Sequence, residues 1–66
     1  MTNNLKVLRA IANVSQEELA KKIEVSRQTI NAMEKGKYVP STILALKLSR
    51  FFKKPVEEIF ALEDND

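Results

Sequence analysis

Hydrophobic and polar residues follow a helical period through most of the chain, most clearly between residues 15 and 36. Ser15 and Glu18 have the S-x-x-E spacing of a capping box, in which a serine side chain and a glutamate side chain close the start of a helix. The apolar positions that follow share one helical face: Leu19, Ala20 and Ile23. The pattern predicts a helix over residues 16–23.

A second helix is expected directly afterwards. Ser26 is a favourable N-cap residue, and Ile30 and Met33 give the next apolar face. Gly36 stands where a left-handed residue would end the helix. These features predict a helix over residues 27–35.

Only about three residues join the two helices, which forces a sharp crossing of the helix-turn-helix kind. Ala20 faces the joint, where a small side chain allows close approach. The outward face of the second helix is polar, with Arg27, Gln28, Thr29 and Asn31. Such side chains can read base edges in a major groove, where arginine pairs with guanine and glutamine or asparagine with adenine. The alternative is an ordinary solvated helix face.

Three more helices are expected. Residues 4–12 carry Leu5, Leu8 and Ala12 on one face, which Val7 and Ile11 widen. Ser41 caps a helix over residues 42–52, and a short helix over residues 55–60 begins with proline in its first turn. Residues 61–66 form a short acidic tail, expected to fray. The prediction is an all-α, five-helix single domain over residues 1–66, without strand alternation. An edge strand in the tail that pairs across a dimer is an alternative too short to predict.

Arg9 lies near the inner face of the first helix, where a charge needs a partner. Glu34, late in the third helix, is the candidate, and the pair would tie these helices together. The alternative is that both side chains face solvent.

Phe51 and Leu62 are candidates for a dimer contact, since an exposed aromatic residue and a C-terminal apolar residue can form a symmetric patch. The alternative, packing within one protomer, is equally compatible with the sequence.

Composition removes several classes of function. The 66 residues contain no Cys and no His, so disulfides, thiolate zinc sites and histidine chemistry are excluded, and no cofactor is implied. No apolar run reaches the roughly 20 residues of a membrane span, and no signal peptide is evident. We expect a cytoplasmic protein that is not an enzyme, because no nucleophile–base or carboxylate pair is evident.

Charge is unevenly distributed. Residues 1–56 carry all eleven basic groups against four acidic ones, whereas residues 57–66 carry five acidic groups and no basic one. A basic body with an acidic end fits a nucleic-acid binder, although a solvated surface would look similar.

Together these motifs resemble a known family. The matching residues are Gln16-x-x-Leu19-Ala20, Val25 to Ile30, Glu34-x-Gly36-Lys37-Tyr38-x-Pro40-Ser41, Leu44-Ala45, Leu48 and Pro55 to Phe60. This set resembles the Cro and phage-repressor-like (XRE-like) helix-turn-helix regulators, over about residues 4–60. The resemblance implies a lambda-repressor-like fold and a homodimer on a pseudo-palindromic operator in double-stranded DNA. No small-molecule ligand is evident.

The resemblance also implies roles for individual residues. The base-reading residues would be Arg27, Gln28, Thr29, Asn31 and Ala32, the last through contact with a thymine methyl group. The phosphate-contacting residues would be Gln16, Ser26, Lys35, Lys37 and Tyr38. Gln16 would also brace the recognition helix, which is the second helix of the helix-turn-helix.

Two positions depart from the family pattern. Glu24 stands where many members have glycine, so a left-handed conformation there costs about 1 kcal/mol and favours a slightly different turn. Glu24 would then weakly repel DNA if it faced that way. The apolar run at residues 10–12 replaces expected charge and is interpreted as neutral filler, the alternative being an additional contact surface.

A sequence-specific transcriptional regulator, more specifically a repressor, is the leading hypothesis. An antitoxin-type autoregulator usually carries an extra segment, for which about six residues remain. A helical protein-interaction module that has lost DNA binding would carry acidic or bulky residues on the third helix, and these are absent.

Overall fold

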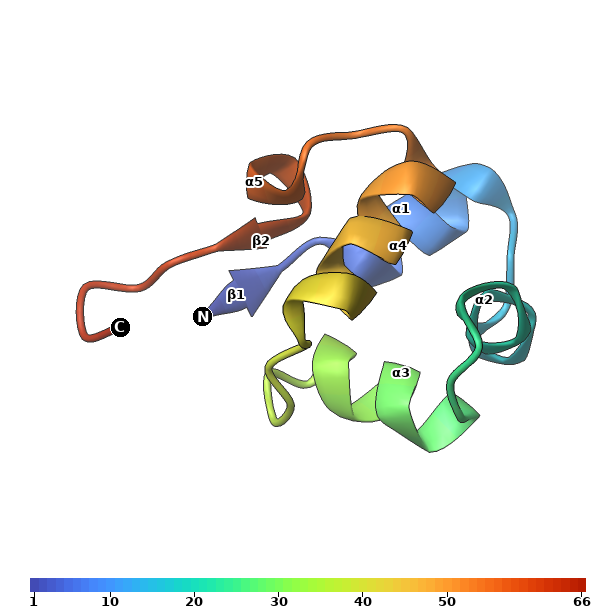
Figure 1. The fold of residues 1–66 in the computed structure, drawn as a ribbon, viewed down its shortest axis with the longest axis horizontal. Coiled ribbons are helices and arrows are strands. Elements are labelled where there is room, and N and C mark those ends of the chain that lie inside the picture. The colour runs from blue at the N-terminus through green and yellow to red at the C-terminus, as the bar shows by residue number, and fades with distance from the viewer.

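The structure is a computed structural model that describes all 66 residues. Its elements are β1 (Thr2–Asn3), α1 (Leu5–Ala12), α2 (Gln16–Ile23), α3 (Arg27–Glu34), α4 (Thr42–Phe52), α5 (Val56–Ile59) and β2 (Phe60–Ala61). The predicted all-α fold of five helices, with a helix-turn-helix at α2 and α3, is confirmed (Figure 1). The helices differ from the predicted ranges only at their ends.

Three serines begin three of the helices, as predicted. The side chains of Ser15, Ser26 and Ser41 each accept a hydrogen bond from the backbone N–H three residues later. At Ser15 the box is complete, because the Glu18 side chain accepts from the Ser15 N–H at 2.9 Å. Each cap satisfies one N–H that would otherwise lack a partner in the first turn.

Left-handed residues end the first four helices, and only one of these residues is glycine. Gly36 has φ +73°, and the N–H groups of Gly36 and Lys37 return to Met33 O and Ala32 O at 3.0 and 2.9 Å, which is a Schellman motif. Asn13, Glu24 and Lys53 hold φ between 56° and 63° without being glycine. The expectation that Glu24 would alter the turn is therefore wrong. The Glu24 carboxylate lies 3.4 Å from Lys47 Nζ on α4, so the charge of Glu24 faces α4.

Glu24→Gly is expected to raise the free energy of unfolding by about 0.5–1 kcal/mol, because glycine adopts the left-handed conformation without a clash at Cβ. The lost contact to Lys47 is exposed and contributes little. Urea denaturation would measure the difference, with Lys47→Ala as the control that removes the same ion pair alone. A Glu24→Gly protein no more stable than Lys47→Ala would contradict the strain argument.

Eleven apolar side chains form the core beneath the helix-turn-helix. The fully buried large ones are Leu5, Leu19, Ile30, Met33, Leu48 and Ile59. The prediction that Val7 and Ile11 widen the buried face of α1 is wrong, since they are 59% and 76% exposed. At about 100° per residue, Val7 and Ile11 lie about 200° and 240° around the helix from Leu5, which puts them off its buried stripe. Ala12, at the end of α1, is also exposed.

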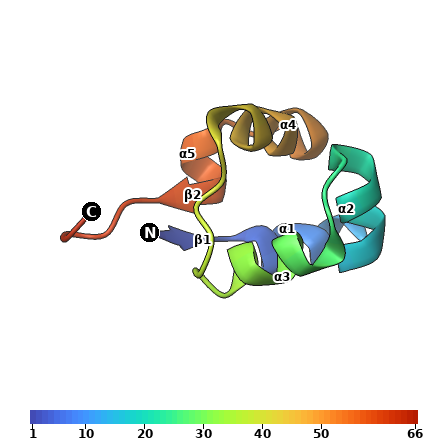
Figure 2. The same ribbon diagram turned by 60° about the horizontal axis from the view of Figure 1, so that its bottom comes forward.

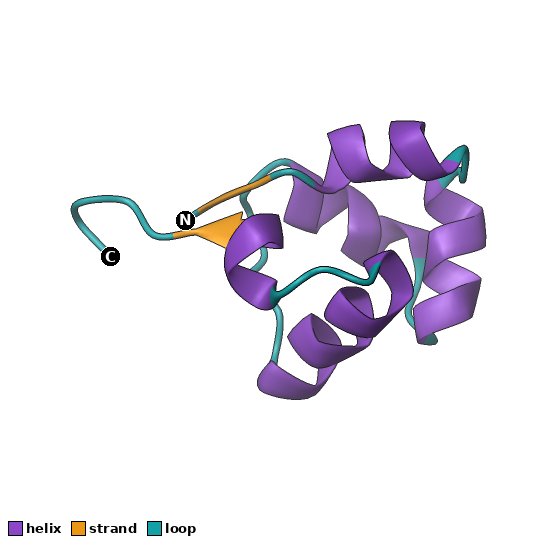
Figure 3. Ribbon diagram, turned by 90° about the horizontal axis from the view of Figure 1, so that it is seen from above, coloured by secondary structure: helices purple, strands orange, loops and turns teal.

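A two-stranded sheet was not predicted. β1 pairs antiparallel with β2, with Thr2 opposite Ala61 and Asn3 opposite Phe60. The backbone therefore turns extended at Phe60 rather than continuing the helix, while the Phe60 side chain remains buried. Figure 3 shows the two strands side by side, with the tail leaving beyond them. Glu63 and Asp66 of this tail each lie 2.8 Å from the N-terminal ammonium group, so the expected fraying is not seen.

Candidate nucleic-acid interface

Helix α3 lies along one edge of the molecule (Figure 1), and the residues that begin it are polar. Ile30 and Met33 anchor it in the core. Ala20 of α2, at the joint, is 3% exposed, as expected for a close crossing. The two leading residues, Arg27 and Gln28, are exposed. The predicted base-reading residues of the next turn are half-buried: Thr29, Asn31 and Ala32.

The first turn of α3 is closed by two hydroxyl groups. Ser26 Oγ accepts from the Thr29 N–H at 3.1 Å and lies 2.9 Å from Thr29 Oγ1. The two hydroxyl groups are therefore engaged with each other, and Ser26 Oγ also accepts the capping hydrogen bond. The N–H groups of Arg27 and Gln28 have no partner within the helix, as is usual in a first turn. Such groups can donate to an anion such as a phosphate.

A small polar recess lies where the start of α2 meets α3. Gln16, Arg27, Gln28 and Asn31 line it, and none of the lining residues is apolar. Its volume is about 180 Å³. The recess brings together a predicted phosphate-contacting residue and three predicted base-reading residues, which are up to fifteen positions apart in the sequence.

An ion pair between Arg9 and Glu34 adjoins this recess. Arg9 donates through Nε and Nη2 to the two carboxylate oxygens of Glu34, the second bond at 3.0 Å, and through Nη1 to Val14 O at 3.2 Å. The side chains of Arg9 and Glu34 are 15% and 8% exposed. The structure thus brings together the two residues expected to tie α1 to α3.

The same carboxylate also accepts from Gln16. Gln16 Nε2 lies 3.2 Å from Glu34 Oε1 and 3.3 Å from Asn31 Oδ1, so both protons of the amide have acceptors. A phosphate could not receive a hydrogen bond from this amide unless one of these bonds broke. The Gln16 backbone N–H, first in α2, remains the available donor.

Glu34 is ionised despite its position. Burial raises the pKa of its carboxyl group, but hydrogen bonds from Arg9 and Gln16 and the charge of Arg9 outweigh burial, so that the pKa falls below 4.5. The hydrogen bond to Glu34 is the main cause that raises the pKa of Arg9. Both groups are charged at neutral pH.

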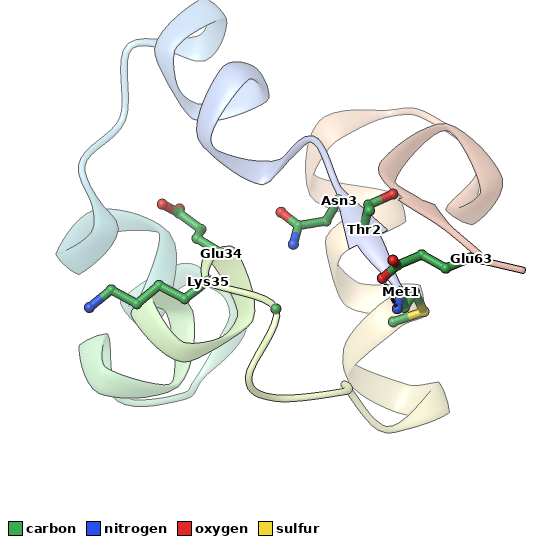
Figure 4. A pocket seen from close by; sticks show the side chains of 7 residues that line it. Met1, Thr2, Asn3, Glu34, Lys35 and Glu63 are labelled. Atoms are coloured by element: carbon green, nitrogen blue, oxygen red, sulfur yellow. Dashed lines mark hydrogen bonds and ion pairs between the residues drawn. The ribbon is translucent and has the colours of Figure 1, made fainter. Parts of the chain in front are cut away.

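The three remaining predicted phosphate contacts lie at or just beyond the C-terminal end of α3. Lys35, Lys37 and Tyr38 are exposed there. The largest recess of the molecule is nearby, between β1, the end of α3 and Glu63 (Figure 4). Lys35 points away from Met1 and Glu63 in this view. Asn3 donates to Met33 O at 2.8 Å and so joins β1 to the end of α3.

The two residues predicted for a dimer contact occupy different environments. Phe51 is half-buried against the core, with its ring 4.9 Å from that of Phe52 in an edge-to-face arrangement. Leu62 follows β2 and is 79% exposed.

Sequence reasoning missed a second exposed apolar surface. Val39, Ile43 and Leu46, here called the apolar face, are all more than half exposed. Val39 and Leu46 border a mainly apolar groove of about 260 Å³, whose floor includes Ala45, Val56 and Phe60. Figure 2 shows the loop after α3 passing in front of β1 and β2 to reach α4. The signal was present, because Ile43 and Leu46 fall off the buried stripe of α4.

No group of His, Cys, Asp and Glu side chains is arranged to hold a metal ion. None of the helices has the length and hydrophobicity that crossing a membrane requires.

Comparison with known proteins gives consistent matches. A family model described as "Helix-turn-helix" matches residues 5–59. The uncharacterized HTH-type transcriptional regulator MJ0272 of Methanocaldococcus jannaschii is 56% identical over 66 residues, covering all of both chains. The uncharacterized HTH-type transcriptional regulator YgzD of Bacillus subtilis is 47% identical over the same full lengths. An uncharacterized HTH-type transcriptional regulator of Archaeoglobus fulgidus is 46% identical, covering all of this chain and 93% of its own.

Proposed function

The chain belongs to the helix-turn-helix family of DNA-binding transcriptional regulators, and we propose that it is a repressor that binds a pseudo-palindromic operator as a homodimer. The observation that carries the proposal is the exposed polar face of α3. Arg27 and Gln28 stand free of the core at the end of the helix that enters a major groove first in this motif.

Each half of the operator would be read by one α3 helix. Arg27, Gln28, Thr29, Asn31 and Ala32 would face the bases. Backbone N–H groups at the starts of α2 and α3, together with Lys35, Lys37 and Tyr38, would hold the phosphates on either side. The Gln16 and Ser26 side chains already have partners within the protein, so we assign their phosphate contacts to the helix starts that they form.

The second copy would pack on the apolar face. The loop from α3 leads directly to Val39 and Ile43, so the apolar face follows the end of α3 along the chain and could form an isologous two-fold contact. The molecule measures 32 × 22 × 21 Å. Two such bodies side by side have centres whose separation is of the same order as the roughly 34 Å between half-sites one helical turn apart. An exposed apolar surface of this kind commonly marks a protein interface.

Gln28→Ala is expected to weaken binding to the operator by about tenfold to a hundredfold and to change the preferred base at one position, because a glutamine contact to a base contributes about 1–3 kcal/mol of discrimination. Lys37→Ala should weaken all sequences alike and lower the salt slope by about 0.9. Random-sequence selection would first define the operator. Both variants would then be titrated against operator and scrambled DNA over a range of salt concentrations.

Equal losses on the two DNAs for Gln28→Ala would remove Gln28 from base reading. A wild-type protein that bound no duplex at low salt would refute the proposed function altogether.

A further inference from the structure

The hydrogen bonds that join Arg9, Glu34, Gln16 and Asn31 determine how two side-chain amides are oriented. Glu34 is an ionised carboxylate, so its oxygens can only accept hydrogen bonds. Gln16 must therefore turn its NH₂ group, and not its oxygen, toward Glu34 Oε1 at 3.2 Å. A flipped Gln16 amide would place an oxygen atom against the carboxylate.

The same NH₂ group then determines the orientation of Asn31. Its second proton is directed at Asn31 Oδ1, 3.3 Å away. A flipped Asn31 would bring two NH₂ groups together, donor against donor. Asn31 is thus held with its oxygen toward α2, and its Nδ2 group has no partner within the protein.

This arrangement extends from the ion pair to the surface that would meet DNA. Arg9 keeps Glu34 charged, Glu34 orients Gln16, and Gln16 orients Asn31. Asn31 lines the polar recess with Arg27 and Gln28, so the free Nδ2 group belongs to the proposed base-reading surface.

We propose that Gln16 is a positioning residue for base recognition, and that it makes Asn31 present a hydrogen-bond donor to the major groove. The inference rests on the proposed function and extends it to a preference at one base. An isolated asparagine can donate to adenine N7 and accept from adenine N6. With its oxygen already engaged by Gln16, Asn31 selects base edges that accept: purine N7, guanine O6 or thymine O4. Cytosine, which shows only the N4 donor in the major groove, is disfavoured.

Gln16→Met tests the proposal, because methionine has similar length and no amide. Glu17→Gln, one position along α2 and outside the network, is the matched control. The position contacted by Asn31 is defined as the one whose base preference is lost in Asn31→Ala. At that position, each protein would be measured against all four base pairs and against 7-deazapurines, which lack N7.

Wild-type protein and Glu17→Gln are expected to discriminate against cytosine about tenfold there, as expected for one hydrogen bond together with an unpaired donor. Gln16→Met should reduce this discrimination to about twofold and leave the positions read by Arg27 and Gln28 unchanged. If a purine is preferred, its 7-deaza analogue should weaken the wild-type protein about fivefold. A Gln16→Met profile identical to that of the wild type would overturn the proposal.

A second measurement needs no DNA and so separates this proposal from the proposed function. In the free protein, NMR exchange should show both Gln16 side-chain amide protons protected and the Asn31 amide protons exchanging freely. The reverse pattern would show that the Asn31 amide points inward, and would overturn the proposal even if the protein represses an operator.

Discussion

Replacing Arg9 with methionine is expected to lower the free energy of unfolding by about 3 kcal/mol, one of the largest losses available to a single substitution in this chain. The loss arises because Glu34 would be left without its charged partner. Its side chain is 8% exposed, and without Arg9 only Gln16 still donates to it. A nearly buried carboxylate with half its partners removed must either remain charged at a cost or take up a proton.

Chemical denaturation of four proteins would measure this effect: wild type, Arg9→Met, Arg9→Lys and the double variant Arg9→Met/Glu34→Leu. Lysine keeps the charge but cannot form the two-pronged contact, so it should retain only part of the stability. The double variant removes both charges and should recover most of it. A double variant less stable than Arg9→Met would show that the charge on Glu34 was not the source of the loss.

The pH dependence of stability has a definite sign at this pair. The pKa of Glu34 is lower in the folded protein than its ordinary value of 4.5. The stability contributed by the ionised carboxylate is therefore fully present above about pH 4.5 and is lost as the pH falls through the folded pKa. The double variant should lack this part of the acid transition.

Replacing Ile43 with lysine is expected to abolish the dimer at micromolar concentration and to weaken binding to a complete operator by a hundredfold or more. A two-fold axis places each interface residue in the contact twice, so a single substitution introduces two like charges into an apolar surface. Two linked half-site contacts gain about 10²–10⁴ over one. That advantage is what the variant should lose, whereas binding to a single half-site should change little.

Sedimentation equilibrium and titration with one-site and two-site duplexes would measure both effects. Ile11→Lys is the matched control, because Ile11 is about as exposed as Ile43 but lies on α1. Leu62→Lys tests the surface suggested by the sequence. A dimer that survived Ile43→Lys and was lost in Leu62→Lys would place the contact at the tail instead.

Local chemistry explains why most of the fold could be predicted from the sequence. Ser15, Ser26 and Ser41 act within one turn of themselves, and Gly36 ends α3 through bonds to residues only a few positions away. Features that depend on distant partners were missed. The strand at Phe60 exists only because Asn3 lies beside it, and two residues are too few to show an alternating pattern.

In the candidate site, too, local features could be predicted, whereas most contacts between distant residues could not. Helical periodicity predicted the face of α3 that carries Arg27 and Gln28. The contact of Arg9 with Glu34 was predicted because a charge that points inward needs a partner. The bonds from Gln16 to Asn31 and Glu34 depend on the crossing of α2 over α3, which periodicity within either helix cannot specify. The reading of individual bases stays a prediction.

The small sheet also bears on the order in which the chain folds. The bonds within the helix-turn-helix join residues such as Gln16 and Glu34, 18 positions apart, whereas Asn4 and Glu58 next to the strands are 54 apart. Contacts between near neighbours in sequence form fastest. The pairing of β1 with β2, which brings residues 2–3 to residues 60–61, is therefore expected to form later than the contacts within the helix-turn-helix.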